Sequence, residues 1–222
     1  MKITINTFIL LFFIAARAQN DVSEYYFSKS KNKNPTTYQY VNIKDSKDRY
    51  FWRVTYDDVR DELITEGFNE EFFKFNYFVE KYVSNGTILV KAIDYQKHYF
   101  VLTKSHVADI VKNDVYKWNS DIEYDYEINI TGEYGNTTLN KSRKFIGFET
   151  IEVQGKSYDC AKFIEEYKNV FHDHNVTHEM YQITYYAHSL GMIKCVKYID
   201  QDTIDYELSS ILTDEEFDEL KD

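Results

Sequence analysis

Apolar and polar residues alternate one by one along most of the chain, between about residues 24 and 211. The clearest run places Tyr124, Tyr126, Ile128 and Ile130 between acidic and polar neighbours. Strands with one buried face show this two-residue period because successive side chains point to opposite sides of a sheet. Similar runs occupy residues 73–79, 87–93, 99–102, 151–153, 181–185 and 192–199. The pattern therefore predicts a mainly β protein.

Short polar segments containing glycine and asparagine separate these runs. They are Asn85-Gly86, Thr131-Gly132, Tyr134-Gly135-Asn136 and Gln154-Gly155-Lys156. Glycine and asparagine supply the backbone conformations that tight hairpins need, so we expect successive antiparallel hairpins. A meander this long must protect its edges, either by closing into a barrel, by folding into a sandwich or by curling around a helix or ligand.

Two segments break the alternation and predict short helices. In residues 105–112, Ser105 is a candidate N-cap ahead of three apolar residues at helical spacing. Near the C-terminus, Thr213 and Glu216 form a capping-box pattern, with Phe217 and Leu220 on one side. We expect a short acidic helix over residues 213–221.

The first eighteen residues have the features of a secretory signal. Lys2 precedes an apolar run over residues 8–16, and Ala16-Arg17-Ala18 resembles a cleavage site. The sequence thus predicts a signal peptide over residues 1–18 and a single β-rich domain over residues 19–222, secreted or periplasmic. No later stretch is apolar for long enough to predict a transmembrane anchor.

Composition narrows the range of functions. The formal charge of the 222-residue chain is −11, which argues against nucleic acid as a partner because phosphate binding needs a basic face. Its 21 tyrosines and 16 phenylalanines include adjacent pairs that place aromatic rings on both faces of a strand. A curved sheet enclosing an apolar cavity would explain these rings, and so would tyrosines whose hydroxyls reach solvent.

The two cysteines, Cys160 and Cys195, leave two possibilities open. An even pair suits a disulfide in an oxidising compartment, provided that their strands are neighbours. Alternatively, both are buried free thiols that act as small apolar side chains.

Three histidines form the densest group of ligand-type residues. His172, His174 and His178 would lie on one face of an extended strand and could then bind zinc or copper. The competing interpretation is an exposed hairpin tip.

Catalytic motifs are lacking, so we expect neither an enzyme nor a cofactor. Adjacent carboxylates occur at Asp57-Asp58, Glu70-Glu71 and Glu165-Glu166. Neighbouring strand residues point to opposite faces, so no such pair converges by itself, and we interpret all three as solvated surface.

One part of the chain resembles a known family. Residues 147–164 contain Gly155 followed by Tyr158-Asp159-Cys160, and residues 184–194 read Thr-Tyr-Tyr-Ala-His-Ser-Leu-Gly-Met-Ile-Lys. Over residues 145–200 this is similar to the TapB-like family of Gram-negative envelope proteins. Tyr185 and Ser189 stand where that family has tryptophan and glycine. The resemblance implies a single, strongly curved antiparallel sheet, a half-barrel or barrel similar to periplasmic lipoprotein carriers, and implies no catalytic residues.

These observations favour a non-catalytic envelope protein that binds a lipid or another apolar or amphipathic ligand inside a curved sheet. The alternative is a structural or interaction protein that docks another envelope protein through exposed aromatic side chains.

Overall fold

Thirteen β-strands make up most of the described chain, as the alternation predicts. The computed structural model describes residues 21–97, 103–119, 121–132 and 135–221, so the predicted signal peptide lies outside the described residues. The elements are η1 (Ser23–Tyr25), β1 (Thr36–Asn42), β2 (Asp45–Asp57), β3 (Glu62–Phe68), β4 (Lys74–Val83), β5 (Gly86–Lys97), β6 (Thr103–Val107), β7 (Asp109–Lys117), β8 (Tyr124–Gly132), β9 (Gly135–Val153), β10 (Lys156–Phe171), η2 (His172–His174), β11 (Val176–Ala187), β12 (Gly191–Ile199), β13 (Asp202–Leu212) and α1 (Asp214–Glu219), where η denotes a 3-10 turn.

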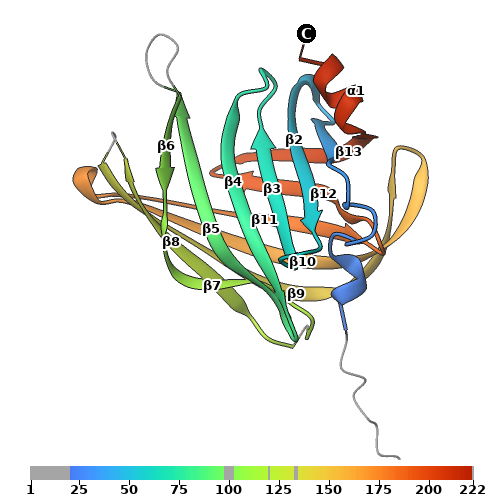
Figure 1. Ribbon diagram of the computed structural model, residues 1–222, viewed down its shortest axis with the longest axis horizontal. Helices are drawn as coiled ribbons and strands as arrows, with labels where there is room; N and C mark the ends of the chain where they lie inside the picture. The colour runs from blue at the N-terminus through green and yellow to red at the C-terminus, as the bar shows by residue number, and fades with distance from the viewer. Residues whose placement is uncertain (1–20, 98–102, 120, 133–134, 222) are drawn as a thin grey trace, which may run out of the picture.

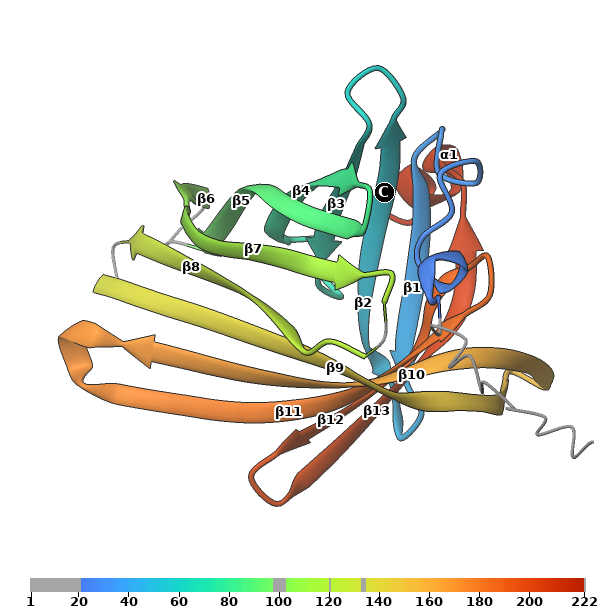
Figure 2. The same ribbon diagram turned by 90° about the horizontal axis from the view of Figure 1, so that it is seen from below.

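The strands form a closed barrel. Their order is β4-β3-β2-β1-β13-β12-β11-β10-β9-β8-β7-β5, and β5 also pairs with β4, which joins the two ends of the series. Every pairing is antiparallel, and twelve strands form the ring. Strand β6 lies outside this count and pairs with the last part of β5. In Figure 1, β3, β4 and β5 run steeply in front of β10, β11 and β12, which cross behind them. Figure 2 gives the view at right angles. Closure pairs the edges of the meander, and the predicted barrel-like sheet is confirmed.

Alternate residues point into and out of the barrel, as the two-residue period requires. In β8, Tyr124 and Ile128 are 6% and 3% exposed, so this run buries the face that its pattern predicted. In β2, Tyr50 and Trp52 line the interior and are partly buried, whereas Phe51 between them points outward and is fully buried. The outer face of β2 must therefore have its own cover.

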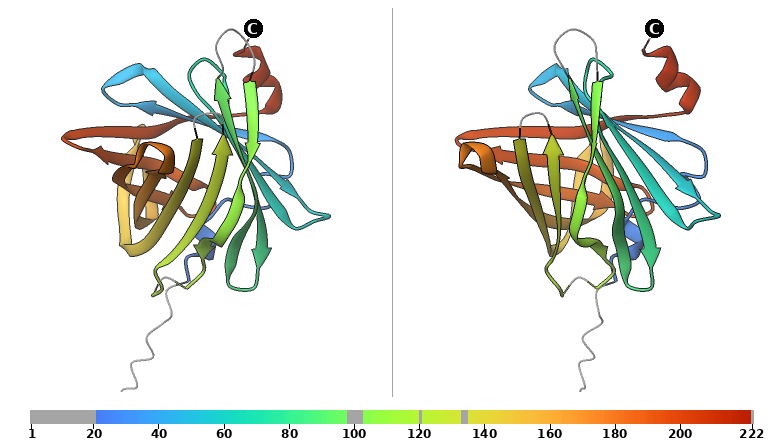
Figure 3. Two further views of the ribbon diagram at one scale, coloured as in Figure 1. Left: turned by 90° about the vertical axis from the view of Figure 1, so that its left-hand side faces the viewer. Right: turned by 60° about the vertical axis from the view of Figure 1, so that its left-hand side comes forward.

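Helix α1 supplies that cover. It begins with the predicted capping box, in which Thr213 accepts a hydrogen bond from the Glu216 backbone and the Glu216 side chain accepts one from the Thr213 backbone. Phe217 is fully buried against the rings of Phe51 and Phe68, at centroid distances of 5.4 and 5.2 Å. Figure 3 shows α1 outside the barrel, at the end away from η1. The predicted C-terminal helix is thus present.

The helical turn predicted for residues 105–112 is wrong. Residues 103–107 form β6 against β5, and β7 begins at Asp109. Val107 and Val111 are 68% and 54% exposed, so their apolar spacing does not mark a helix face packed on a core. Pairing with β5, including the hydrogen bond from the Ala108 N–H to the Ala92 carbonyl, outweighs the local helical pattern.

The segment that follows residue 21 crosses one end of the barrel. Val22 is fully buried and its N–H donates to the Trp118 carbonyl, beyond the end of β7. Farther along, the Phe27 carbonyl accepts from the hydroxyl of Tyr82 on β4, and the Asn32 carbonyl from the backbone of β2. These contacts on separate strands close that end. Within the described part of the chain, no helix has the length and apolar character to cross a membrane.

Candidate functional site

A cavity of about 470 Å³ lies inside the barrel, between the N-terminal segment and the β3–β4 turn. Tyr26 and Phe27 border it at the closed end, and Asn69 and Glu70 at the other. Rings and other apolar side chains supply much of the wall, among them Tyr50, Trp52, Phe75, Phe78, Leu89, Tyr126, Leu139, Met180 and Met192. The aromatic residues that the sequence placed on both strand faces thus include a set that faces an internal space.

A row of polar side chains crosses one wall of this cavity. Arg143 on β9 lies opposite Glu165 on β10, Glu165 opposite Gln182 on β11, and Gln182 opposite Lys197 on β12. All four line the cavity. The register of four adjacent strands thus places two cations, a carboxylate and an amide in line across the inner face of the sheet.

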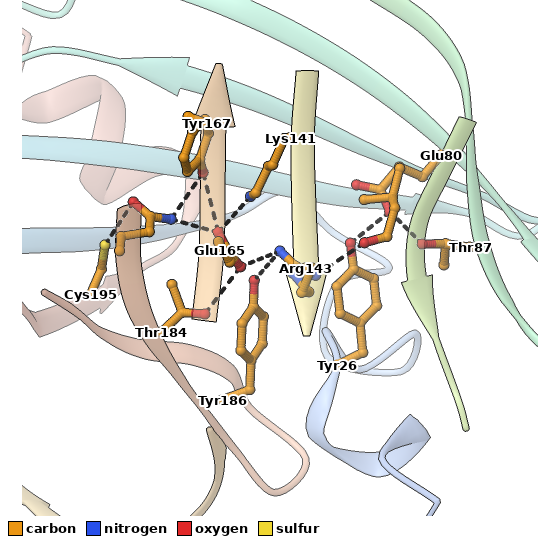
Figure 4. Close-up of polar contacts among 12 residues, drawn as sticks. Tyr26, Glu80, Thr87, Lys141, Arg143, Glu165, Tyr167, Thr184, Tyr186 and Cys195 are labelled. Atoms are coloured by element: carbon orange, nitrogen blue, oxygen red, sulfur yellow. Dashed lines mark hydrogen bonds and ion pairs between the residues drawn. The ribbon is translucent and has the colours of Figure 1, made fainter. Parts of the chain in front are cut away.

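Glu165 is the centre of this row and is completely buried. Its carboxylate forms ion pairs with Arg143 at 2.6 Å and Lys141 at 2.7 Å (Figure 4). Gln182 Nε2 donates a hydrogen bond to Oε2 at 2.6 Å, and the Thr184 hydroxyl donates one to Oε1 at 3.0 Å. Both carboxylate oxygens are therefore occupied, and Glu165 acts to hold the two cations in place.

The surroundings set the ionisation of these groups. Burial by itself would raise the pKa of Glu165, but Arg143 and Lys141 outweigh it and lower the pKa to about 2. Burial lowers the pKa of Lys141, and the attraction of Glu165 opposes this only in part. Glu165 is accordingly ionised throughout the physiological range.

Glu80 is a second buried carboxyl with a different environment. Its side chain accepts hydrogen bonds from Tyr26 at 2.6 Å and Thr87 at 2.7 Å, as Figure 4 shows. Burial raises its pKa, and the two hydrogen bonds only partly oppose that change. Because Tyr26 belongs to the N-terminal segment, Glu80 also ties this segment to the barrel interior.

Lys197 lies at the end of the polar row. Its Nζ is 5.0 Å from the ring centroid of Tyr50 and 4.8 Å from that of Tyr206, which are favourable cation–π positions. Unlike Lys141 and Arg143, it forms no ion pair with any carboxylate of the described residues. Lys197 thus contributes a cation that is not directly paired, while Asp48 accepts hydrogen bonds from the hydroxyl of Tyr206.

The structure does not form a disulfide between Cys160 and Cys195; both are free and buried. Cys160 is on β10 and Cys195 on β12, so β11 separates them. Two strand spacings amount to about 9–10 Å, beyond the Cα separation that a disulfide spans. Burial raises the pKa of each thiol to about 12. The alternative of two buried free thiols describes this structure.

The three histidines lie at the β10–β11 tip. His172 and His174 belong to the turn η2 rather than to an extended strand, so the assumed alternation of their side chains does not hold. His172 Nε2 lies 2.8 Å from the Thr138 hydroxyl, while His178 is on β11 opposite Asn169. All three are exposed, and the described residues contain no group of three ligands placed to hold a metal ion.

The polar row did not emerge from the sequence, and the prediction that Glu165 lies on the solvated surface is wrong, because Glu165 is fully buried. The opposite directions of Glu165 and Glu166 were predicted correctly, since only Glu166 is exposed. One sequence pattern could have indicated buried charges, because Leu139, Lys141 and Arg143 share one face of β9. Charged residues at inward positions of a strand are informative, but the ion pair itself requires the pairing of β9 with β10.

No family model matches the chain, and no curated protein matches its sequence. A solved structure of a candidate lipoprotein from Parabacteroides distasonis is similar, with 13% identity, coverage of 85% of this chain and 98% of that chain, and a TM-score of 0.55. A candidate exported protein with a YmcC-like fold from Bacteroides fragilis is 13% identical, with coverage of 85% of this chain and 99% of that chain and a TM-score of 0.49. The hypothetical lipoprotein YmcC from Escherichia coli is 13% identical, with coverage of 81% of this chain and 87% of that chain and a TM-score of 0.37. The first likeness supports the same fold, and at this identity it concerns the fold alone.

Proposed function

We propose that this protein is a non-catalytic, exported envelope protein that binds an amphipathic small molecule inside its barrel. The observation that carries the proposal is the internal cavity, which combines aromatic walls with a row of charged side chains. Small-molecule sites are typically concave and mainly apolar, with a few polar groups that fix the orientation of the ligand.

The size and lining of the cavity support this function. A volume of about 470 Å³ falls within the range that small-molecule sites occupy. Trp52, Phe78 and Tyr126 offer rings to an apolar chain, while Lys141 and Lys197 offer donors to a polar head. The occupant that suits such a wall is an amphiphile, such as a lipid or an acyl-chain compound.

Export is supported by two independent observations. The first eighteen residues have the features of a secretory signal, and the Parabacteroides protein of similar fold is described as a candidate lipoprotein. We therefore place the mature chain in the envelope or outside the cell. Membership of the TapB-like family is part of the same proposal and rests on the motifs around Cys160 and Leu190.

A structural protein that docks a partner through exposed aromatic rings takes second place. Among the described residues, Phe148 is the aromatic residue with the largest exposed fraction, 49%, yet its ring already contacts Tyr25 and Phe145. Ile43 and Val59 are exposed in the β1–β2 and β2–β3 turns, and Phe171 and Val176 form one exposed pair at the β10–β11 tip. Single exposed apolar residues are common on protein surfaces and need no partner.

Two measurements on residues 19–222, purified without detergent, test the proposed function. The first is native mass spectrometry, and the second is binding of the neutral fluorescent probe N-phenyl-1-naphthylamine. We expect a bound small molecule that is released on unfolding, or uptake of the probe after extraction. The variant Thr65→Phe, which adds a ring at a cavity-lining position, should reduce probe binding. Thr203→Phe, at an exposed position of β13, is the matched control. A clean polypeptide mass together with no probe uptake would exclude the cavity as a binding site.

A further inference from the structure

The charges that line the cavity are unevenly distributed. The complete set consists of Arg49, Lys141, Arg143 and Lys197 as cations and Asp48, Glu70, Glu80 and Glu165 as carboxyl groups. Asp48 and Arg49 are at the start of β2, and Glu70 is in the β3–β4 turn, so these three belong to the end away from the N-terminal segment. Lys197 lies close to this end, because its ammonium is over the ring of Tyr50, which follows Arg49, and over that of Tyr206, whose hydroxyl binds Asp48. The other charged residues are Lys141, Arg143, Glu80 and Glu165.

On the inner wall, three cations face two carboxyl groups. Arg143 and Lys141 share the single carboxylate of Glu165. The other inner carboxyl, Glu80, forms hydrogen bonds with two hydroxyl groups and no ion pair among the described residues, and burial raises its pKa. With Lys197 added, this part of the wall has one more cation than carboxyl groups, in a chain whose formal charge is −11.

Lys197 has the clearest capacity to bind another group. It is half-buried, lines the cavity and lies over two tyrosine rings, which hold its stem without neutralising its charge. Its cross-strand neighbour Gln182 is already engaged, because Nε2 donates to Glu165 and Oε1 accepts from Cys195. Asp48 lines the same cavity and accepts hydrogen bonds from the Tyr206 hydroxyl, but it forms no ion pair with Lys197, so the Lys197 ammonium has no direct anionic partner among the described residues.

Arg143 is more fully engaged than Lys197. Its guanidinium donates to the Val115 carbonyl, the Tyr186 hydroxyl and Glu165, and Figure 4 shows the last two contacts. Nε is buried without a hydrogen bond of good geometry, and the buried Tyr124 hydroxyl also interacts with this guanidinium. An unpaired buried donor costs free energy unless a ligand or water satisfies it. Of the three cations, Lys197 is therefore the one with the clearest free capacity toward a ligand.

We propose, building on the proposed function, that the ligand is an anionic amphiphile. Its carboxylate or phosphate head binds Lys197 beside the Arg143–Glu165–Lys141 cluster, and its apolar chain lies against Tyr50, Trp52 and Phe78. Charge-assisted hydrogen bonds in a partly dry cavity are stronger than neutral ones, so the head group supplies selectivity while the chain supplies apolar contact.

Fluorescence titration with dansyl-undecanoic acid and its methyl ester tests this assignment, because the two probes differ in the charge of the head group. The wild-type protein should bind the acid at least about ten-fold more tightly than the ester, in line with the strength of hydrogen bonds to charged groups. Lys197→Gln should reduce that preference to about three-fold or less while leaving binding of the ester unchanged. Lys144→Gln, an exposed lysine on the outer face of β9, should keep the full preference.

The outcomes distinguish failure of the anionic assignment from failure of the proposed function, and a competition experiment distinguishes a carboxylate head from a phosphate head. Equal binding of acid and ester by the wild-type protein, or an unchanged preference in Lys197→Gln, would overturn the anionic assignment while the proposed function stands. Failure to bind either probe, or N-phenyl-1-naphthylamine, would overturn both. Displacement of the dansyl acid by oleate but not by oleoyl lysophosphatidate identifies a carboxylate head, and the reverse result identifies a phosphate head.

Discussion

Glu165 and Arg143 face each other across the β9–β10 pairing, and their side chains form an ion pair of 2.6 Å inside the barrel. Both residues are almost completely inaccessible to solvent, at 0% and 5% exposure. Burial of an ion pair is costly unless its remaining hydrogen-bonding groups are satisfied. Glu165 meets that condition through Lys141, Gln182 and Thr184, so removal of its charge should affect both stability and the cavity wall.

We expect Glu165→Gln to destabilise the protein by about 3 kcal/mol, because it leaves Arg143 and Lys141 buried without a counter-charge. Urea unfolding at neutral pH measures this loss. Glu166→Gln is the matched control, since the adjacent side chain is exposed, and it should change the free energy of unfolding by less than about 0.5 kcal/mol. Equal effects of the two substitutions would contradict the central role of Glu165.

The stabilising effect of Glu165 should disappear in acid. Its pKa in the folded state is about 2, below its ordinary value of 4.5, so the ionised form favours folding. The contribution is complete above about pH 4.5 and decreases as the pH falls toward 2. The difference in unfolding free energy between wild type and Glu165→Gln should therefore shrink between pH 7 and pH 3. A constant difference over that interval would show that the charge of Glu165 is not responsible.

Glu80 should show the opposite pH dependence. Burial raises its pKa above the ordinary value of 4.5, so the folded state holds this proton more tightly than the unfolded state does. Stability contributed by the protonated form is complete below about pH 4.5 and is lost as the pH rises through the folded pKa. Glu80→Gln keeps an acceptor for Tyr26, and we expect it to unfold at higher urea concentrations than wild type at pH 8 but not at pH 4. A variant that is less stable at both pH values would contradict this assignment.

Phe217 should account for most of the attachment of α1. Replacement by alanine removes a fully buried ring from its contacts with Phe51, Phe68 and Phe72, at an expected cost of about 3 kcal/mol. Leu220→Ala, in the same segment but at a 43% exposed position, should cost less than about 1 kcal/mol. Thermal unfolding of both variants distinguishes a buried anchor from a solvated tail, and similar losses would argue against the anchor.

Cys160 and Cys195 should remain free and unreactive in the folded protein. Both are 1% exposed, and burial raises their pKa to about 12, so little thiolate is present at pH 8. Iodoacetamide should modify neither thiol before unfolding and both after unfolding in guanidinium, as measured by intact mass. A mass 2 Da below that of the dithiol, or a lack of modification after unfolding, would instead indicate a disulfide.

Local chemistry accounts for the parts of the fold that the sequence predicts correctly. The alternation around Tyr124 specifies a strand with one buried face, and Thr213 with Glu216 specifies the start of α1, because each pattern depends only on neighbours within a few residues. By the same logic Glu165 and Glu166 had to point to opposite faces. The local pattern was insufficient for residues 105–112, where pairing of β6 with β5 outweighed a helical spacing.

Contacts between distant parts of the chain determined the closure of the barrel, the polar row and the separation of the two cysteines. Closure into a barrel depends on β5 pairing with both β4 and β7, and no local pattern distinguishes it from a sandwich. The row from Arg143 to Lys197 exists because the registers of four strands coincide, and the separation of Cys160 from Cys195 exists because β11 lies between them. The sequence by itself determined most strands and turns and which residues of a regular strand share a face. Only the tertiary structure determined which charges meet inside the barrel, since strand order and register are set by the burial of the whole sheet.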